Sequence, residues 1–96
     1  MSLQEAYKKK AEAEVELAQA RLEEFKARTK NFTAETRLKY AEQVDNLEHG
    51  VNTAKAKLKE LGEAGENAWE HLKDGVEKAL RSLSDTIRDI ADKFKD

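Results

Sequence analysis

The fold of this chain is decided by residues 68–94, which read AWEHLKDGVEKALRSLSDTIRDIADKF. Large apolar side chains recur through this stretch at steps of three or four residues, which is the spacing of one face of a helix. Ala68, Ala79 and Ala91 lie beside this seam and widen it. A helix with a wide apolar stripe packs on two neighbours. The stretch therefore predicts one helix of an all-α bundle and gives the strongest core signal in the chain.

Two narrower seams precede it, one starting at Ala11 and one at Tyr40. In both, the apolar positions alternate steps of four and three, which is typical of a coiled coil. Between Phe32 and Tyr40 the phase slips, because positions 32, 36 and 40 are two successive steps of four. Such a slip marks either a stutter in one continuous helix or the end of a helix.

Two segments are candidates for turns. Residues 61–67, LGEAGEN, contain two glycines, and Gly62 is suited to a left-handed C-cap. The second candidate spans residues 29–33, where Thr33 is suited to N-cap the following helix. Gly50 and Gly75 fall inside strong helical patterns, so we interpret them as tolerated helix glycines that each cost about 1 kcal/mol relative to alanine.

With both turns, residues 1–96 form a single helical domain with helices at about 3–29, 33–61 and 66–95. Nearly equal helices with short connections predict an antiparallel three-helix bundle or coiled coil. If only the turn near Gly62 exists, the alternative is a long helical hairpin that oligomerises to bury its seam. The predicted core or interface residues are Val15, Leu22, Phe25, Phe32, Tyr40, Val44, Leu47, Val51, Leu58, Leu61, Trp69, Leu72, Val76, Leu80, Leu83, Ile87, Ile90 and Phe94.

Composition narrows the function classes. Charged residues make up 40% of the chain, proline and cysteine are absent, and the formal net charge is −2. A nucleic-acid-binding protein would show a basic face, so we expect no nucleic-acid partner. No stretch reaches the roughly 20 apolar residues that a membrane span requires. We expect a soluble protein, cytoplasmic by default and periplasmic if a signal peptide has been removed.

No motif for catalysis, a metal or a cofactor is present. His49 and His71 are the only two histidines, and a metal site needs three or four ligands. We interpret both as solvent-facing. The many carboxylates alternate with bases on outer faces, as in the i, i+4 pairs Glu24–Arg28 and Glu77–Arg81. We therefore expect no catalytic, cofactor-binding or metal residue, and a protein that is not an enzyme.

Three segments carry a resemblance to a known group. They are LKYAEQV at 38–44, AKAKLKEL at 54–61 and AWEHLKDGVEKAL at 68–80. Together they resemble a group of small bacterial coiled-coil proteins that carry a similar AWE-L--GVE-A block. The resemblance covers about the last 60 residues. It implies a helical, stress-associated or exported accessory protein of unassigned activity and no ligand residues.

These observations favour a non-catalytic structural or interaction protein that acts through self-association or by docking another helical protein. Trp69 could anchor such an interface, although its position in the seam favours the core. One alternative is an amphipathic protein that binds a lipid or membrane surface. This is less favoured, because the polar face of residues 80–94 carries both charge signs. Another alternative is a desiccation-type stress protectant that is helical only when dried or bound.

Overall fold

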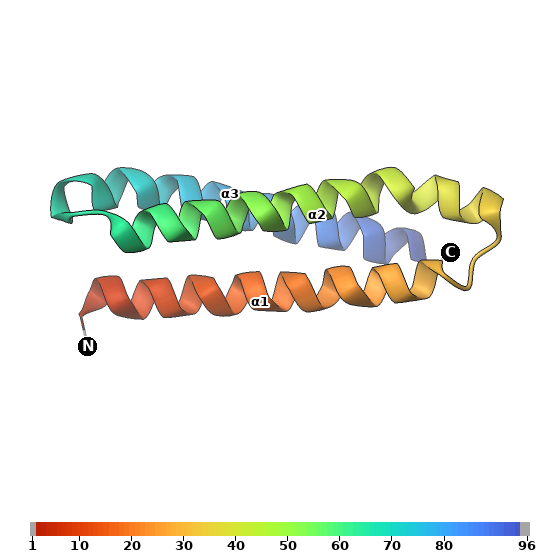
Figure 1. Ribbon diagram of the computed structural model, residues 1–96, viewed down its shortest axis with the longest axis horizontal. Coiled ribbons are helices and arrows are strands. Elements are labelled where there is room, and N and C mark those ends of the chain that lie inside the picture. Colours follow the sequence, from red (N-terminus) through yellow and green to blue (C-terminus); the bar gives the residue numbers. More distant parts are fainter. Residues whose placement is uncertain (1, 95–96) are drawn as a thin grey trace.

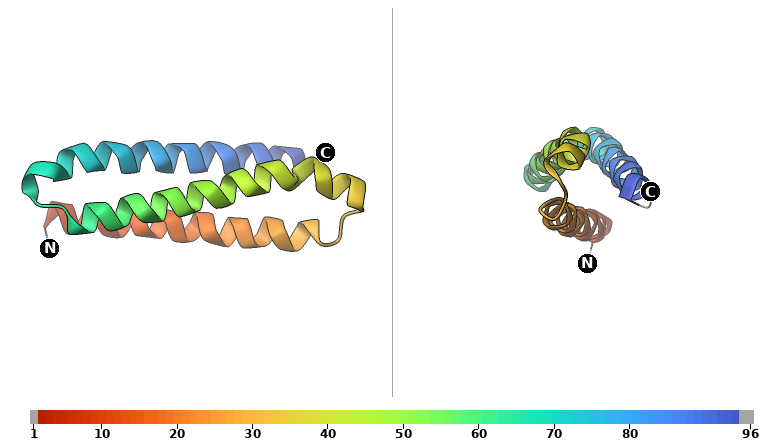
Figure 2. Two further views of the ribbon diagram at one scale, coloured as in Figure 1. Left: turned by 45° about the horizontal axis from the view of Figure 1, so that its top comes forward. Right: turned by 90° about the vertical axis from the view of Figure 1, so that its right-hand side faces the viewer.

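The computed structural model describes residues 2–94, which form three helices and no strand (Figure 1). They are α1 (Leu3–Thr29), α2 (Ala34–Glu63) and α3 (Glu66–Phe94). Helices α1 and α3 run in the same direction, and α2 runs antiparallel to both (Figures 1 and 2). The bundle measures 50 × 20 × 18 Å. The prediction of an all-α three-helix bundle is confirmed. The alternative long hairpin is wrong, because the chain reverses between Thr29 and Ala34.

The first turn is held by side chains and contains no glycine. The Thr33 side-chain oxygen accepts a hydrogen bond from the Thr36 N–H at 3.2 Å, which makes Thr33 the N-cap of α2. The Arg37 guanidinium donates to the carbonyl oxygens of Thr29 at 3.2 Å and Lys30 at 3.1 Å. These carbonyls lie at the end of α1, where a helix has no N–H donors of its own for its last carbonyls. The Phe32 N–H also donates to the Thr29 carbonyl, at 3.1 Å. Arg37 therefore adds donors at this helix end and ties the start of α2 to the end of α1.

The second turn differs from the prediction. Helix α2 continues through Gly62 to Glu63, and no described glycine has a positive φ. The predicted left-handed C-cap at Gly62 is therefore wrong. Ala64 instead leaves the helix in an extended conformation, φ −76° and ψ 143°, and its N–H donates to the Leu61 carbonyl at 3.2 Å. At Gly62 a Cβ atom would lie 3.1 Å from Nζ of Lys8. The glycine thus leaves room for the Lys8 side chain across the end of α2.

The predicted helix bounds agree at most ends. Helix α1 spans the predicted 3–29, and α3 starts at the predicted residue 66. Helix α2 starts one residue later than predicted and ends two residues later, at Glu63. Residue 95, the predicted end of the third helix, lies outside the described residues.

The core lies along the axis of the bundle. Each of α1 and α2 contributes one stripe with the alternating spacing, whereas the fully buried residues of α3 lie seven apart. The small side chains of Ala11, Ala18 and Ala54 are buried as completely as the large ones and let the helices approach closely. The buried residues are Ala11, Val15, Ala18, Leu22, Phe25, Val44, Leu47, Val51, Ala54, Leu58, Leu61, Val76, Leu83 and Ile90.

Gly50 has a packing function that the sequence did not reveal. A Cβ atom at this position would lie 2.9 Å from Cδ2 of Leu83, which is buried. The interpretation of Gly50 as a merely tolerated glycine is therefore wrong, because the absent side chain is what lets Leu83 of α3 seat against α2. At Gly75 the nearest atom is Nζ of Lys57 at 3.6 Å, an ordinary van der Waals contact.

Candidate interaction groove

The apolar stripe of α3 is only partly covered by the other two helices. Leu80 and Ile87 belong to the predicted core, yet both remain half-buried. The reason is the position of α1, which packs more closely on α2 than on α3. An end-on view shows the three helices at the corners of a triangle, with α1 below α2 and α3 beside it (Figure 2, right). One flank of α3 therefore faces α1 across an incompletely filled seam.

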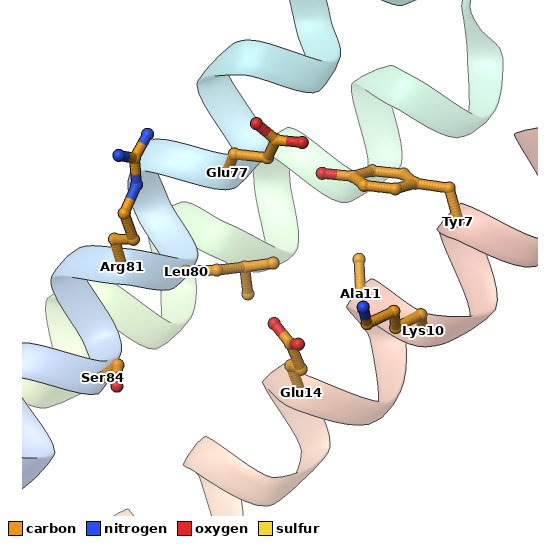
Figure 3. A pocket seen from close by; sticks show the side chains of 8 residues that line it. All are labelled: Tyr7, Lys10, Ala11, Glu14, Glu77, Leu80, Arg81 and Ser84. Carbon is orange, nitrogen blue, oxygen red and sulfur yellow. The ribbon is translucent and has the colours of Figure 1, made fainter.

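The middle of this seam forms a groove between α1 and α3, made of two adjoining hollows, and a further hollow of about 580 Å³ continues past it beside Tyr7 and Trp69. The first has a volume of about 470 Å³ and is shown in Figure 3. Its lining residues are Tyr7, Lys10, Ala11, Glu14, Glu77, Leu80, Arg81 and Ser84. The second has a volume of about 330 Å³ and is more apolar. Its lining residues are Glu14, Leu17, Ala18, Arg21, Leu80, Leu83, Ser84 and Ile87. These residues together are called the α1–α3 groove below.

Leu17 is the residue of this groove that the sequence analysis missed. Its side chain is 64% exposed and lies on the rim of the second hollow. It falls outside the core seam of α1, one position before Ala18. The available signal was a second stripe, at Lys10, Glu14, Leu17, Arg21, Glu24 and Arg28, whose steps also alternate four and three. A large aliphatic residue at the centre of a charged stripe is the feature that could have identified it.

The charged side chains of the groove form no ion pair across it. Within residues 2–94, every ion pair lies either within one helix or between α1 and α2. By contrast, Lys26 of α1 and Glu48 of α2 form an ion pair at 3.2 Å. The expected pair Glu77–Arg81 is not formed. The Glu77 carboxylate instead pairs with the Lys73 ammonium, one turn earlier in α3, with Nζ and Oε1 4.0 Å apart. The expected pair Glu24–Arg28 is formed, at 3.6 Å.

Tyr7 places a hydroxyl group at the edge of the first hollow. Its buried oxygen points toward the Glu77 carboxylate without meeting the full geometry of a hydrogen bond (Figure 3). Burial, the negative charges of Glu77 and Glu14, and the approach of the hydroxyl to the Glu77 carboxylate raise the pKa of Tyr7 to about 12. All of these causes disfavour the charged phenolate. Tyr7 is therefore a neutral residue whose hydroxyl faces an acceptor on α3.

Aromatic contacts cross between α1 and α3 near both ends of the groove. At one end the Tyr7 and Trp69 rings meet edge to face with centroids 5.6 Å apart, and the Lys73 ammonium lies 5.2 Å from the centre of the Tyr7 ring. At the other end Phe94 contacts Phe25 with centroids 5.1 Å apart. Such pairs stabilise beyond the area that they bury. They join α1 to α3 at the two ends and leave the middle of the groove to Leu17, Leu80 and Ile87.

The aromatic residues near the first turn form one cluster with Phe94. Phe94 lies 5.6 Å from Phe32 and 4.9 Å from Tyr40, centroid to centroid. The Tyr40 hydroxyl donates to the Lys93 carbonyl oxygen at 3.0 Å. It therefore supplies a hydrogen-bond donor to one of the last carbonyls of α3. Phe32, suggested by sequence to cap the end of the bundle, lies in this cluster.

The structure sorts the predicted core or interface residues into two groups. The buried ones are Val15, Leu22, Phe25, Val44, Leu47, Val51, Leu58, Leu61, Val76, Leu83 and Ile90. The half-buried ones are Phe32, Tyr40, Trp69, Leu72, Leu80, Ile87 and Phe94. His49 and His71 are both exposed. Among residues 2–94, no group of three or more potential metal-ligating side chains converges.

The fold and this groove define a three-helix bundle with one incompletely covered seam. No known protein family, curated protein sequence or solved structure matches the chain. Within the described part of the chain, no helix is both long enough and apolar enough to cross a membrane.

Proposed function

We propose that this chain is a non-catalytic interaction protein whose α1–α3 groove docks an amphipathic helix. The observation that carries the proposal is the partial burial of Leu80 and Ile87, which face Leu17 across the groove. A three-helix bundle with one open seam can accept a fourth helix, because helices in such bundles pack side by side through alternating knobs and holes.

The energetics favour occupation of the groove. Complete burial of an aliphatic side chain stabilises by roughly 1.5–3 kcal/mol. Leu17 is 64% exposed, so most of this contribution is still available at that position. The aromatic contacts of Trp69 and Phe94 hold the ends of the groove in place, which reduces the entropy that docking would cost.

The competing functions have less support. Membrane-surface helices usually combine an apolar face with a basic polar face. The flanks of this groove instead mix acids and bases, with Glu14 beside Lys10 and Glu77 beside Arg81. A protectant that is helical only when dried would lack a packed core, and Leu47 and Val76 are fully buried here. The stress-associated role that the sequence resemblance implies is compatible with helix docking.

The proposal is tested by measuring whether a helix covers Ser84, which lines both hollows. Ser84→Cys is labelled with a small trifluoromethyl group, and its ¹⁹F signal is recorded with a soluble paramagnetic agent. The probes added are the unlabelled chain and a synthetic peptide with the sequence of residues 66–94. The matched control is Ser82→Cys, which is exposed on another face of α3.

We expect either probe to protect the label at position 84 from paramagnetic broadening and to leave the label at position 82 unchanged. Equal protection of both positions would indicate nonspecific association and contradict the proposal. Continued exposure of position 84 with both probes at millimolar concentration would also contradict it. Vesicles of anionic lipid are added in a separate arm, and protection by vesicles alone would favour a lipid surface over a helix.

A further inference from the structure

We infer that the occupant of the α1–α3 groove is a second copy of this chain, docked antiparallel about a two-fold axis near Leu17. The inference rests on the proposed docking function and assigns its partner and its register. Two features carry it: the exposed side chain of Leu17 on the rim of the second hollow and the order of charges along α1.

The second hollow offers apolar surface of α3 beside Leu17. On α3 its lining residues are Leu80, Leu83, Ser84 and Ile87, which follow the i, i+3, i+4, i+7 pattern. Four residues in this pattern form a surface on which a side chain of a neighbouring helix packs in a coiled coil. Ser84 is exposed and is the smallest of the four side chains, so it leaves this part of α3 open.

Leu17 is the apolar centre of the proposed interface. It is the exposed large aliphatic residue on the rim of the second hollow and lies at the same level along the bundle as Leu83 and Ser84. A two-fold axis through this level sets Leu17 of one copy against Leu17 of the other, at the rims of the two second hollows. Isologous contacts of this kind use one patch twice, so a single exposed leucine per chain contributes to the interface from both sides.

The charges along α1 are ordered for the same axis. From Leu17, Glu14 lies three residues before and Arg21 four residues after, while Lys10 and Glu24 lie seven residues to either side. In an antiparallel pair centred on Leu17, Glu14 faces Arg21 of the other copy, and Lys10 faces Glu24. Both pairs join opposite charges, and each occurs twice in the dimer.

The parallel arrangement has the opposite electrostatics. There Glu14 would face Glu14 and Arg21 would face Arg21, so every pair would join like charges. Residues flanking the seam of a coiled coil set the orientation of the partner in this way. Within one chain, Arg21 forms an ion pair with Glu24 at 3.3 Å, whereas Glu14, two helical turns or about 10 Å from Arg21, forms no ion pair within residues 2–94. Glu14 is thus the acid of α1 whose charge a second copy's Arg21 would meet.

Charge reversal tests the register. Glu14→Arg and Arg21→Glu are prepared separately, and association is measured by sedimentation equilibrium at low salt. Each variant alone places like charges opposite each other twice. We expect its dimer dissociation constant to rise at least tenfold over that of the original chain. In an equimolar mixture of the two variants both cross-pairs are opposite in sign, and we expect dimer formation to return.

Restoration in the mixture is the decisive result, because a general loss of folding would not be reversed by mixing two defective chains. Circular dichroism of each variant checks that the helices persist. A dimer that is insensitive to both reversals would overturn the antiparallel register and leave helix docking intact. A strict monomer whose Ser84 label is protected by the 66–94 peptide would overturn self-association, while docking would still stand. Exposure of that label to both probes would overturn the docking function itself.

Discussion

Gly50 of α2 lies directly against Leu83 of α3, so that a Cβ atom at Gly50 would lie 2.9 Å from Cδ2 of Leu83. This contact sets how closely the two helices approach in the middle of the bundle. Leu83 is 2% exposed and is surrounded by the core. Its side chain therefore has little room to move away from an added methyl group.

Alanine substitutions at two helix glycines should have opposite effects. Gly75→Ala should raise the free energy of unfolding by about 1 kcal/mol, because it adds helix propensity at a position with room for a methyl group. Gly50→Ala adds the same propensity but overpacks the core, which typically costs 1–3 kcal/mol, so the net change should be zero to about 2 kcal/mol of destabilisation. Urea unfolding monitored by circular dichroism measures both. A stabilised Gly50→Ala would show that Leu83 moves aside freely.

The first turn should depend on the shape of the Arg37 side chain. Arg37→Met removes the donors to the carbonyls of Thr29 and Lys30, so it should lower the free energy of unfolding by about 1–2 kcal/mol. We expect a value near 1 kcal/mol, because these hydrogen bonds are exposed to solvent. Arg37→Lys keeps the charge but lacks the planar fork that reaches both carbonyls. It should recover less than half of the loss. Arg88→Met, on an exposed position of α3, is the control and should change stability by less than about 0.5 kcal/mol. Equal stability of the two methionine variants would show that Arg37 does not hold the turn.

Tyr7 should make stability depend on alkaline pH. Its pKa is raised from 10.0 to about 12 in the folded chain, so the unfolded chain loses this proton first. The folded state therefore binds more protons above pH 10.0, and stability falls as the pH rises through this window. The contribution of the neutral Tyr7 side chain to the free energy of unfolding is complete below pH 10.0 and is lost by about pH 12.

Tyr7→Phe isolates this effect from the titration of lysines, which also occurs in this range. Denaturant unfolding of both proteins on either side of pH 10.0 should show a smaller loss for the phenylalanine variant. At neutral pH the stability of the variant should lie within about 1 kcal/mol of that of the original chain, because the hydroxyl that it removes faces the Glu77 carboxylate without forming a full hydrogen bond. A spectrophotometric titration should lose a phenolate transition near pH 12. Identical pH profiles would show that Tyr7 does not titrate abnormally.

Phe94 should contribute more to stability than its position near the end of α3 suggests. Its ring contacts Phe25, Phe32 and Tyr40, which come from α1, the first turn and α2. Phe94→Ala should lower the free energy of unfolding by about 3 kcal/mol. This is the low end of the range for buried aromatic residues, because the Phe94 ring is only half-buried. Phe94→Leu preserves most of the apolar volume and should cost about half as much. Thermal and urea unfolding measure both, and a loss below about 0.5 kcal/mol for Phe94→Ala would show that the end of α3 frays independently.

The helices and most of the core could be predicted from the sequence alone. The alternation of four and three residues identifies Val15, Leu47 and Val76 as inward-facing, because a helix repeats its faces with a fixed period. The absence of proline, the Thr33 N-cap and the glycines near residue 62 located the helix ends to within two residues. These features are local, so each segment carries its own information about them.

The tertiary structure alone decided how the helices rotate and how closely they approach. Gly50 is a packing residue only because Leu83, distant in sequence, lies against it. Likewise, Leu80 and Ile87 share the seam of α3 with Leu83 and Ile90, yet only the latter two are fully covered. Their burial depends on the distance between α1 and α3. A periodic pattern shows which face of a helix is apolar, but the position of the neighbouring helices determines which edge of that face remains open.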